Sequence, residues 1–128
     1  MSQEENRQIV QHFWATMETN DFRAVGELLH DDFLLDYPQS GERIRGRDNW
    51  VALNANYPAQ GRWHFDLHRL IADEHGVATD VTVTDGVIVA RSVLFSEIRD
   101  GRIARQTEYW PDPFEAPASR AQWVEHIG

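Results

Sequence analysis

Residues 84–110, "TDGVIVARSVLFSEIRDGRIARQTEYW", contain two Asp-Gly pairs separated by a segment in which apolar and polar side chains alternate. Alternation with a period of two indicates a strand with one buried face. Glycine accepts the positive φ that a tight turn requires, so Asp-Gly between two such segments indicates a β-hairpin. This stretch therefore predicts consecutive antiparallel strands joined by short turns.

The same period of two extends upstream to Trp63. We therefore expect an antiparallel meander of four strands, at residues 63–72, 77–84, 87–98 and 102–110.

The N-terminal half has helical periodicity instead. "SQEE", residues 2–5, has the pattern of a capping box, and the apolar residues within 9–17 recur at helical spacing. A second, short helix is expected with its apolar face within 22–29, and a third over 48–57. Each helix has one apolar stripe that must be covered by another layer.

The remaining segments complete the fold. "FLLDYP", residues 33–38, is predicted to be a strand, and "SGERIRG", residues 40–46, a turn-rich loop. A last helical piece is expected from Ser119, where Gln122 would complete a second capping box. Because helices and strands are segregated, we predict one α+β domain over residues 1–128. Three N-terminal helices would wrap around a curved, mainly antiparallel sheet and form a cone with an internal pocket.

Composition and charge exclude several partners. The chain has 128 residues with 12 basic and 21 acidic side chains, which gives a net charge of −9. A strongly acidic domain repels phosphate backbones and anionic lipids, so we expect no nucleic acid and no membrane partner. The absence of cysteine excludes thiolate chemistry and suits a cytoplasmic location. The N-terminus is polar and unlike a signal peptide.

The last predicted strand contains the first candidate for chemistry. Alternation places Ala104, Gln106, Glu108 and Trp110 on one face. One interpretation is a half-solvated surface with an ordinary ion pair at Glu108. The other is that Glu108 lies inside the cone beside Trp110, where burial would raise its pKa and make it a useful general acid or base.

The strand at 33–38 offers two further polar groups. Tyr37 could donate a hydrogen bond in the pocket or be a core tyrosine whose hydroxyl reaches water. Asp36, on the opposite face, could be a second acid or a surface charge. A two-carboxylate hydrolase would need Asp36 to share the pocket with Glu108.

His64, Asp66 and His68 share one face of the strand at 63–72. Three ligands at this spacing could surround a metal ion, but a solvated outer face explains the alternation equally well. We expect no metal and no cofactor, and treat His68 alone as a candidate polar group of the pocket.

The strand at 87–98 has two different faces. Ser92, Leu94 and Ser96 lie on one face, and the bulky residues Val93 and Phe95 lie on the other. A partly apolar outer sheet face often packs against a second copy of the same chain. We therefore expect a homodimer that forms through the outer face of the sheet.

The order of elements and particular segments resemble a known family. The first two helices and first strand, "IRGRDNW" at 44–50, and "DGRIARQTEYWPDPFE" at 100–115 are together similar to the SnoaL-like branch of the nuclear-transport-factor-two-like cone superfamily. That branch includes polyketide cyclases and ketosteroid isomerases. The resemblance implies a small-molecule pocket, and it leaves the reaction open because the fold also hosts hydrolases and non-catalytic binders.

Two groups within this superfamily give different expectations. Against the ketosteroid isomerase pattern, the pocket tyrosine, the general base and the oxyanion-hole acid fall at Phe13, Tyr37 and Leu94, so that apparatus is lost. The same comparison implies that these residues, with Glu108 and Trp110, face the pocket.

The second group is the phenazine-biosynthesis A/B group, to which "TEYWPDPFE" at 107–115 is similar. This similarity implies that Glu108 matches an acid/base glutamate. The pocket histidine that this group has on its third helix has no counterpart between Asp48 and Pro58.

These observations give one functional expectation. We predict an enzyme that performs isomerisation, cyclisation or condensation on a small, flat, apolar or ketone-bearing molecule, with Glu108 and Tyr37 as catalytic groups. The alternative is a non-catalytic ligand-binding or partner-binding domain of the same fold. The residues expected to bind the substrate are apolar or aromatic, with two polar exceptions: Phe13, Trp14, Met17, Leu35, Trp50, Leu53, Tyr57, His68, Ser92, Leu94, Trp110 and Phe114, the last as a cap on the opening.

Overall fold

The computed structural model describes residues 2–127. Helix α1, Gln3–Glu18, begins at the predicted capping box: the Glu5 amide donates to Ser2 Oγ at 3.1 Å, and the Ser2 amide donates to Glu5 Oε1 at 3.4 Å. Helix α2, Phe22–Gly26, is capped by Asp21, whose Oδ1 accepts the Ala24 amide. Helix α3, Arg47–Ala55, follows directly after a glycine with positive φ.

The second helix is shorter than the sequence indicated. Leu29 is not on its apolar face but starts strand β1, Leu29–Tyr37. The two short helices α2 and α3 lie very close together at Gly26. A Cβ placed on this residue would come within 2.6 Å of Val51 Cγ2. This close approach explains why a glycine ends α2.

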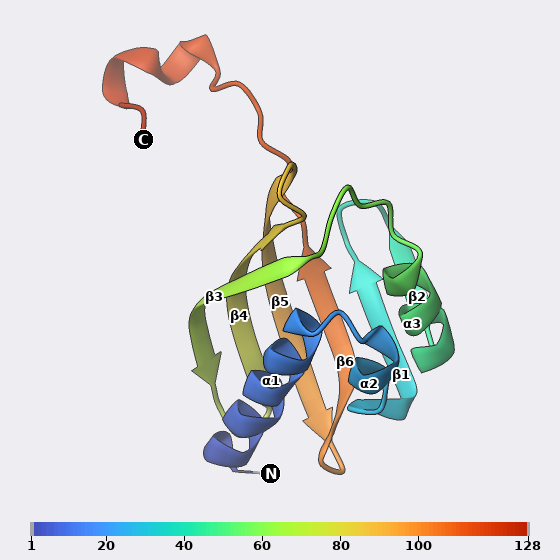
Figure 1. Ribbon diagram of the computed structural model, residues 1–128. Coiled ribbons are helices and arrows are strands. Elements are labelled where there is room, and N and C mark those ends of the chain that lie inside the picture. The colour runs from blue at the N-terminus through green and yellow to red at the C-terminus, as the bar shows by residue number, and fades with distance from the viewer. Residues whose placement is uncertain (1, 128) are drawn as a thin grey trace.

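The described residues form one sheet of six strands in the order β2-β1-β6-β5-β4-β3, in which β2 is the short strand Glu42–Arg45 (Figure 1). The predicted meander is confirmed, with strand ends shifted by up to two residues: β3 His64–Ala72, β4 Gly76–Thr84, β5 Val89–Arg99 and β6 Arg102–Tyr109. Neighbouring strands are antiparallel except β1 and β6, which pair in parallel. The fold class predicted from the sequence, a mainly antiparallel α+β fold, is therefore correct.

Two local predictions were wrong. Residues 40–46 are not only a loop, because Glu42–Arg45 form strand β2 on β1, with Ile44 buried. A four-residue strand contains too few alternations to be recognised from periodicity alone. The last helical piece is a 3₁₀ helix, Ala118–Trp123, that follows Pro117 and has no side-chain cap, so the capping box expected at Ser119 does not form.

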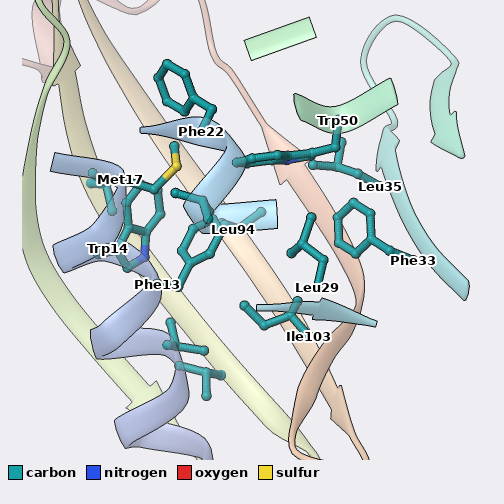
Figure 2. Packing of buried hydrophobic residues seen from close by; sticks show 14 of the residues in the cluster. Phe13, Trp14, Met17, Phe22, Leu29, Phe33, Leu35, Trp50, Leu94 and Ile103 are labelled. Carbon is teal, nitrogen blue, oxygen red and sulfur yellow. The ribbon is translucent and has the colours of Figure 1, made fainter. Parts of the chain in front are cut away.

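The helices cover one face of the curved sheet, and the core lies between these layers (Figure 1). Figure 2 shows Phe13, Trp14 and Met17 of α1 directed toward the side chains of Trp50 and Leu94. Phe33, Leu29 and Ile103 belong to this core and are fully buried. Among residues 2–127, no helix combines the length and apolar character needed to cross a membrane.

Asp85 joins the β4–β5 turn to the loop that precedes β3. Its carboxylate is buried and accepts the backbone amides of Gln60 at 2.9 Å, Val87 at 3.0 Å and Ile88 at 2.8 Å. These backbone hydrogen bonds lower the pKa of Asp85. A carboxyl group whose pKa is lowered by folding stabilises the fold at pH values above the usual pKa of aspartate. This contribution disappears as the pH falls through the lowered pKa.

We predict that Asp85→Ala lowers the free energy of unfolding at neutral pH by about 1–3 kcal/mol, since three amides lose their acceptor. Urea unfolding of both proteins at pH 7 and pH 3 measures the difference, which should shrink at the lower pH. The exposed neighbour substitution Val87→Ala serves as the control. An Asp85→Ala protein as stable as the wild type at pH 7 would contradict this role.

Candidate functional site

A cavity of about 690 Å³ lies between the helices and the inner face of the sheet. Its walls are mostly aromatic and aliphatic, and they include polar side chains such as Gln39, Glu42 and Asp112. The lining includes most of the residues predicted from the sequence: Phe13, Trp14, Met17, Tyr37, Trp50, Leu53, Tyr57, Leu94, Glu108 and Trp110.

The other four predicted residues lie elsewhere. Leu35 is part of the core and Ser92 is buried behind Glu108, so neither is in the cavity lining. His68 is on the outer face of β3, where its Nε2 lies 2.6 Å from Thr82 Oγ1, because the inward positions of this strand are taken by apolar side chains such as Phe65. Phe114 does not cap the opening; it is 79 % exposed and borders a separate, shallower hollow.

Several lining residues were missed. Phe65 and Trp63 lie on the apolar face of the predicted strand 63–72, opposite its histidines. Alternation alone therefore predicts that they point inward. Phe22 of α2 and Asn54 of α3 also line the cavity. Gln106 was placed correctly on the face of Glu108 but not recognised as a site residue.

Glu108 lies on β6 with its side chain in the cavity wall and only 9 % of its surface exposed. Ser92 Oγ on the neighbouring strand β5 donates a hydrogen bond to Glu108 Oε2 at 2.7 Å. Burial raises the pKa of Glu108, and hydrogen bonds from Ser92 and Trp110 only partly oppose this shift. The carboxyl group therefore holds a proton at a higher pH than an exposed glutamate does.

Tyr37 lies at the end of β1 and reaches the same cavity. Burial raises the pKa of its hydroxyl, and the negative charge of Glu108 raises it further. The Tyr37 hydroxyl consequently stays protonated under all ordinary conditions and is available as a hydrogen-bond donor.

Gln106 is the second polar group on the inner face of β6. It is 1 % exposed, and its Nε2 donates to Ser96 Oγ at 3.3 Å. Its Oε1 has no hydrogen-bond partner among residues 2–127. Since a buried amide oxygen without a partner is costly, this atom is a natural acceptor for a ligand group in the cavity.

Asp36 does not share the cavity. It points to the outer face of the sheet, where Arg43 Nε donates to Oδ1 at 2.6 Å and Arg105 Nη2 donates to Oδ2 at 2.8 Å. The hydrogen bond from Arg43, with help from Arg105, lowers the pKa of Asp36 to about 2. Asp36 is thus a structural anion that links β2, β1 and β6.

The histidines of β3 have other partners. His64 Nδ1 lies 3.1 Å from Glu18 Oε2, at the end of α1, and Asp66 is exposed. Within the part of the chain that the structure describes, no group of three His, Asp or Glu side chains is arranged to hold a metal ion.

Comparison with known proteins agrees with the fold. The chain belongs to the SnoaL-like domain family, whose model matches residues 10–106. No curated protein sequence matches this chain. The family and the cavity together define a small-molecule pocket protein of the nuclear-transport-factor-two-like superfamily.

Three solved structures illustrate the range of relatives. A candidate ketosteroid isomerase from Kribbella flavida DSM 17836 is 32% identical, with 98% of this chain and 92% of that chain covered and a TM-score of 0.89. A protein of unknown function from Burkholderia xenovorans LB400 is 36% identical, with coverage of 100% and 99% and a TM-score of 0.82. An epoxide hydrolase of the LEH-like type from M. tuberculosis is 25% identical, with coverage of 85% and 84% and a TM-score of 0.70.

The raised pKa of Glu108 has a consequence for stability. Because the folded state holds this proton more tightly than the unfolded chain, the contribution of Glu108 is most favourable at acidic pH and declines as pH rises through the raised pKa. We predict that Glu108→Gln removes this decline. The variant should gain stability over the wild type as pH rises, by about 1.4 kcal/mol for each unit by which the pKa is raised.

Denaturant unfolding of both proteins between pH 4 and pH 9 measures the gain. Glu97→Gln is the matched control, since Glu97 is exposed on the outer face of the adjacent strand β5. If Glu108→Gln and the wild type differ by the same amount at every pH, the carboxyl group has no raised pKa.

Proposed function

We propose that this protein is an enzyme that moves a proton between Glu108 and a carbon atom of a flat, apolar, ketone-bearing metabolite. The reaction class is isomerisation, cyclisation or condensation. The observation that supports this proposal is a carboxyl group that is buried in the wall of an aromatic cavity and has a raised pKa. A carboxylate with a raised pKa is a stronger base than an exposed glutamate.

The proposed step uses two groups of the chain. Ionised Glu108 takes a proton from the carbon next to the ketone, and the electron pair of the C–H bond moves toward the carbonyl oxygen. The Tyr37 hydroxyl donates a hydrogen bond to that oxygen as its negative charge develops. Glu108, now protonated, returns the proton to another carbon, or to the same one. Indole walls from Trp14, Trp50 and Trp110 favour flat ligands.

A hydrolase that pairs Glu108 with Asp36 in the cavity is disfavoured. Asp36, the partner that such a mechanism would need, is on the outer face and bound to two arginines. The second candidate is therefore a non-catalytic ligand-binding domain. It is supported by the apolar residues Phe13 and Leu94 at positions where the isomerase pattern has polar groups.

Proton abstraction can be tested without the natural substrate. We predict that the wild type accelerates deuterium exchange next to the carbonyl of a flat aryl ketone such as 1-tetralone in D₂O, followed by NMR. Glu108→Gln should lower the accelerated rate by about 10²–10⁴-fold. The wild-type rate should increase with pH through the raised pKa, because the base must be ionised.

Glu97→Gln, the same chemical change on the outer face, is the control and should leave the exchange rate unchanged. Exchange that survives in Glu108→Gln would exclude Glu108 as the base. If a panel of aryl ketones binds, as seen by quenching of the cavity tryptophans, and none exchanges, the binding-domain alternative is favoured instead.

Gln106 should determine which ligands the cavity prefers, because its amide can pair with a polar group of the ligand. Its amide has one end bound to Ser96 and the other end free to pair with an O–H or N–H group of a ligand. We predict that the wild type binds 2-naphthol more tightly than naphthalene, and that Gln106→Leu reduces this preference by about tenfold, which is about 1.4 kcal/mol. Tryptophan fluorescence titration measures both affinities. An unchanged preference in Gln106→Leu would show that this amide does not contact the ligand.

A further inference from the structure

The cavity is lined by acidic side chains and by no basic ones. Three carboxyl groups belong to its lining: Glu42, Glu108 and Asp112. The chain has no lysine, and among residues 2–127 none of its 12 arginines or six histidines lines the cavity. The described lining therefore offers a ligand negative and neutral side chains only, which favours a positively charged ligand over an anion.

Two of the three carboxyl groups lie where the cavity meets the solvent. Six lining residues are exposed, and we call them the rim: Gln39, Ser40, Glu42, Tyr57, Ile88 and Asp112. They come from the β1–β2 turn and the start of β2, the loop after α3, the β4–β5 turn and the segment after β6, which lie at the same end of the sheet (Figure 1).

The segments that carry the two rim carboxylates are joined to each other. The backbone amide of Trp110 donates a hydrogen bond to Gln39 Oε1 at 2.7 Å. This bond holds the β1–β2 turn, and with it Glu42, against the segment that leads to Asp112. The rim therefore has two negative charges on adjoining segments of backbone.

These two charges have no counter-ion in the part of the chain that the structure describes. The ion pairs among residues 2–127 include neither Glu42 nor Asp112, whereas Asp36 and Asp80 each bind two arginines. Glu42 Oε1 accepts a hydrogen bond from a neutral group, Ser40 Oγ, at 2.6 Å. Both carboxylates thus remain available to a cationic group of a ligand.

The aromatic rings near the rim are of the kind that binds cations. Tyr57 is 58 % exposed, and its ring meets that of Trp63 at 66° with the centroids 6.1 Å apart. Tyr37 and Trp110 also line the cavity and are partly exposed. The faces of tyrosine and tryptophan rings carry negative potential and attract a cation within about 6 Å of the ring centre. Anionic side chains and electron-rich rings therefore occur together at this end of the cavity.

An independent observation comes from the interior. Gln106 is 1 % exposed and lines the cavity, and its Oε1 has no hydrogen-bond partner among the described residues. This free atom is an acceptor, as are the oxygens of the rim carboxylates. An ammonium group has only donors, so it can pair with any of these atoms, whereas a carboxylate ligand has only acceptors and can pair with none.

We propose that the cavity selects organic cations: flat, apolar molecules with an ammonium group that lies at the rim near Glu42, Asp112 and the ring of Tyr57. The apolar part of such a molecule fills the aromatic interior. The inference rests on the proposed function for the reacting group, so that the substrate is an aryl ketone that also has an amino group. The preference for positive charge itself applies to any occupant of the cavity.

Three ligands of similar shape and different charge test this preference: 2-naphthylmethylammonium, 2-naphthylmethanol and 2-naphthoate. Each is titrated into the protein at pH 7 by isothermal calorimetry. We expect the wild type to bind the ammonium about tenfold more tightly than the alcohol, and the carboxylate more weakly than either. Sodium chloride should weaken the binding of the ammonium and leave that of the alcohol unchanged, because exposed charges are screened by salt.

The double variant Glu42→Gln, Asp112→Asn should lose this tenfold preference and keep the wild-type affinity for the alcohol. Glutamine at position 42 retains an oxygen that can accept the Ser40 hydroxyl. The matched control is the double variant Asp66→Asn, Glu97→Gln, which removes the same two negative charges from exposed positions outside the lining and should retain the preference.

Four results would overturn the proposal. They are an alcohol that binds the wild type as tightly as the ammonium, a preference that survives in the rim variant, a preference that is lost equally in the control, and a wild type that binds none of the three ligands. The outcome is separate from catalysis. A wild type that prefers the ammonium but accelerates no deuterium exchange keeps the cation preference and loses the enzymatic function, whereas exchange without a charge preference removes only this inference.

Discussion

Strand β6 is the element on which the rest of the structure depends. It pairs in parallel with β1 and antiparallel with β5, so it joins the N-terminal half of the chain to the C-terminal meander. Its central position fixes the direction of its side chains: Gln106 and Glu108 must point toward the helices, and Tyr109 must point outward. A shift of the register by one residue would place the carboxyl group in solvent and a phenol in the cavity.

The position of Glu108 is costly for the fold and useful for chemistry for the same reason. A carboxyl group in an apolar wall loses most of its hydration, and this loss favours the protonated form. Ser92 limits the cost by donating a hydrogen bond at 2.7 Å, but one hydrogen bond does not replace the hydration that the buried carboxyl group has lost. The remaining imbalance raises the pKa of Glu108 above that of an exposed glutamate.

Three carboxylates outside the cavity have much stronger hydrogen-bond donors around them than Glu108 has. Asp36 and Asp80 each bind two arginines, and Asp85 accepts three backbone amides. In all three the pKa is lowered, whereas in Glu108 it is raised. Strong donors thus surround the acids that hold strands and loops together, whereas Glu108 in the cavity wall has only a serine and an indole as donors. This contrast separates structural from candidate catalytic carboxyl groups more clearly than burial alone.

The sequence predicted those features that depend on local periodicity. The meander and the apolar stripe of α1 follow from repeats of two or of 3.6 residues that extend over many positions, and the capping box at Ser2 follows from a four-residue motif. Alternation grouped Glu108 with Gln106 and Trp110 but left open whether that face was solvated, and the family resemblance implied that it lines the pocket. Strand β2 is too short for such a repeat, and His68 could be placed only once a bulge between Leu67 and Arg69 and the inward position of Phe65 were known. The sequence also gave no reason to expect that Asp36 would be enclosed by Arg43 and Arg105, since that cluster joins three strands.

The same alternation gives the end of β6 two different surfaces. Glu108 and Trp110 face the cavity, and Tyr109 between them faces the outer surface. One short segment of backbone therefore belongs both to the cavity wall and to the outer surface of the sheet.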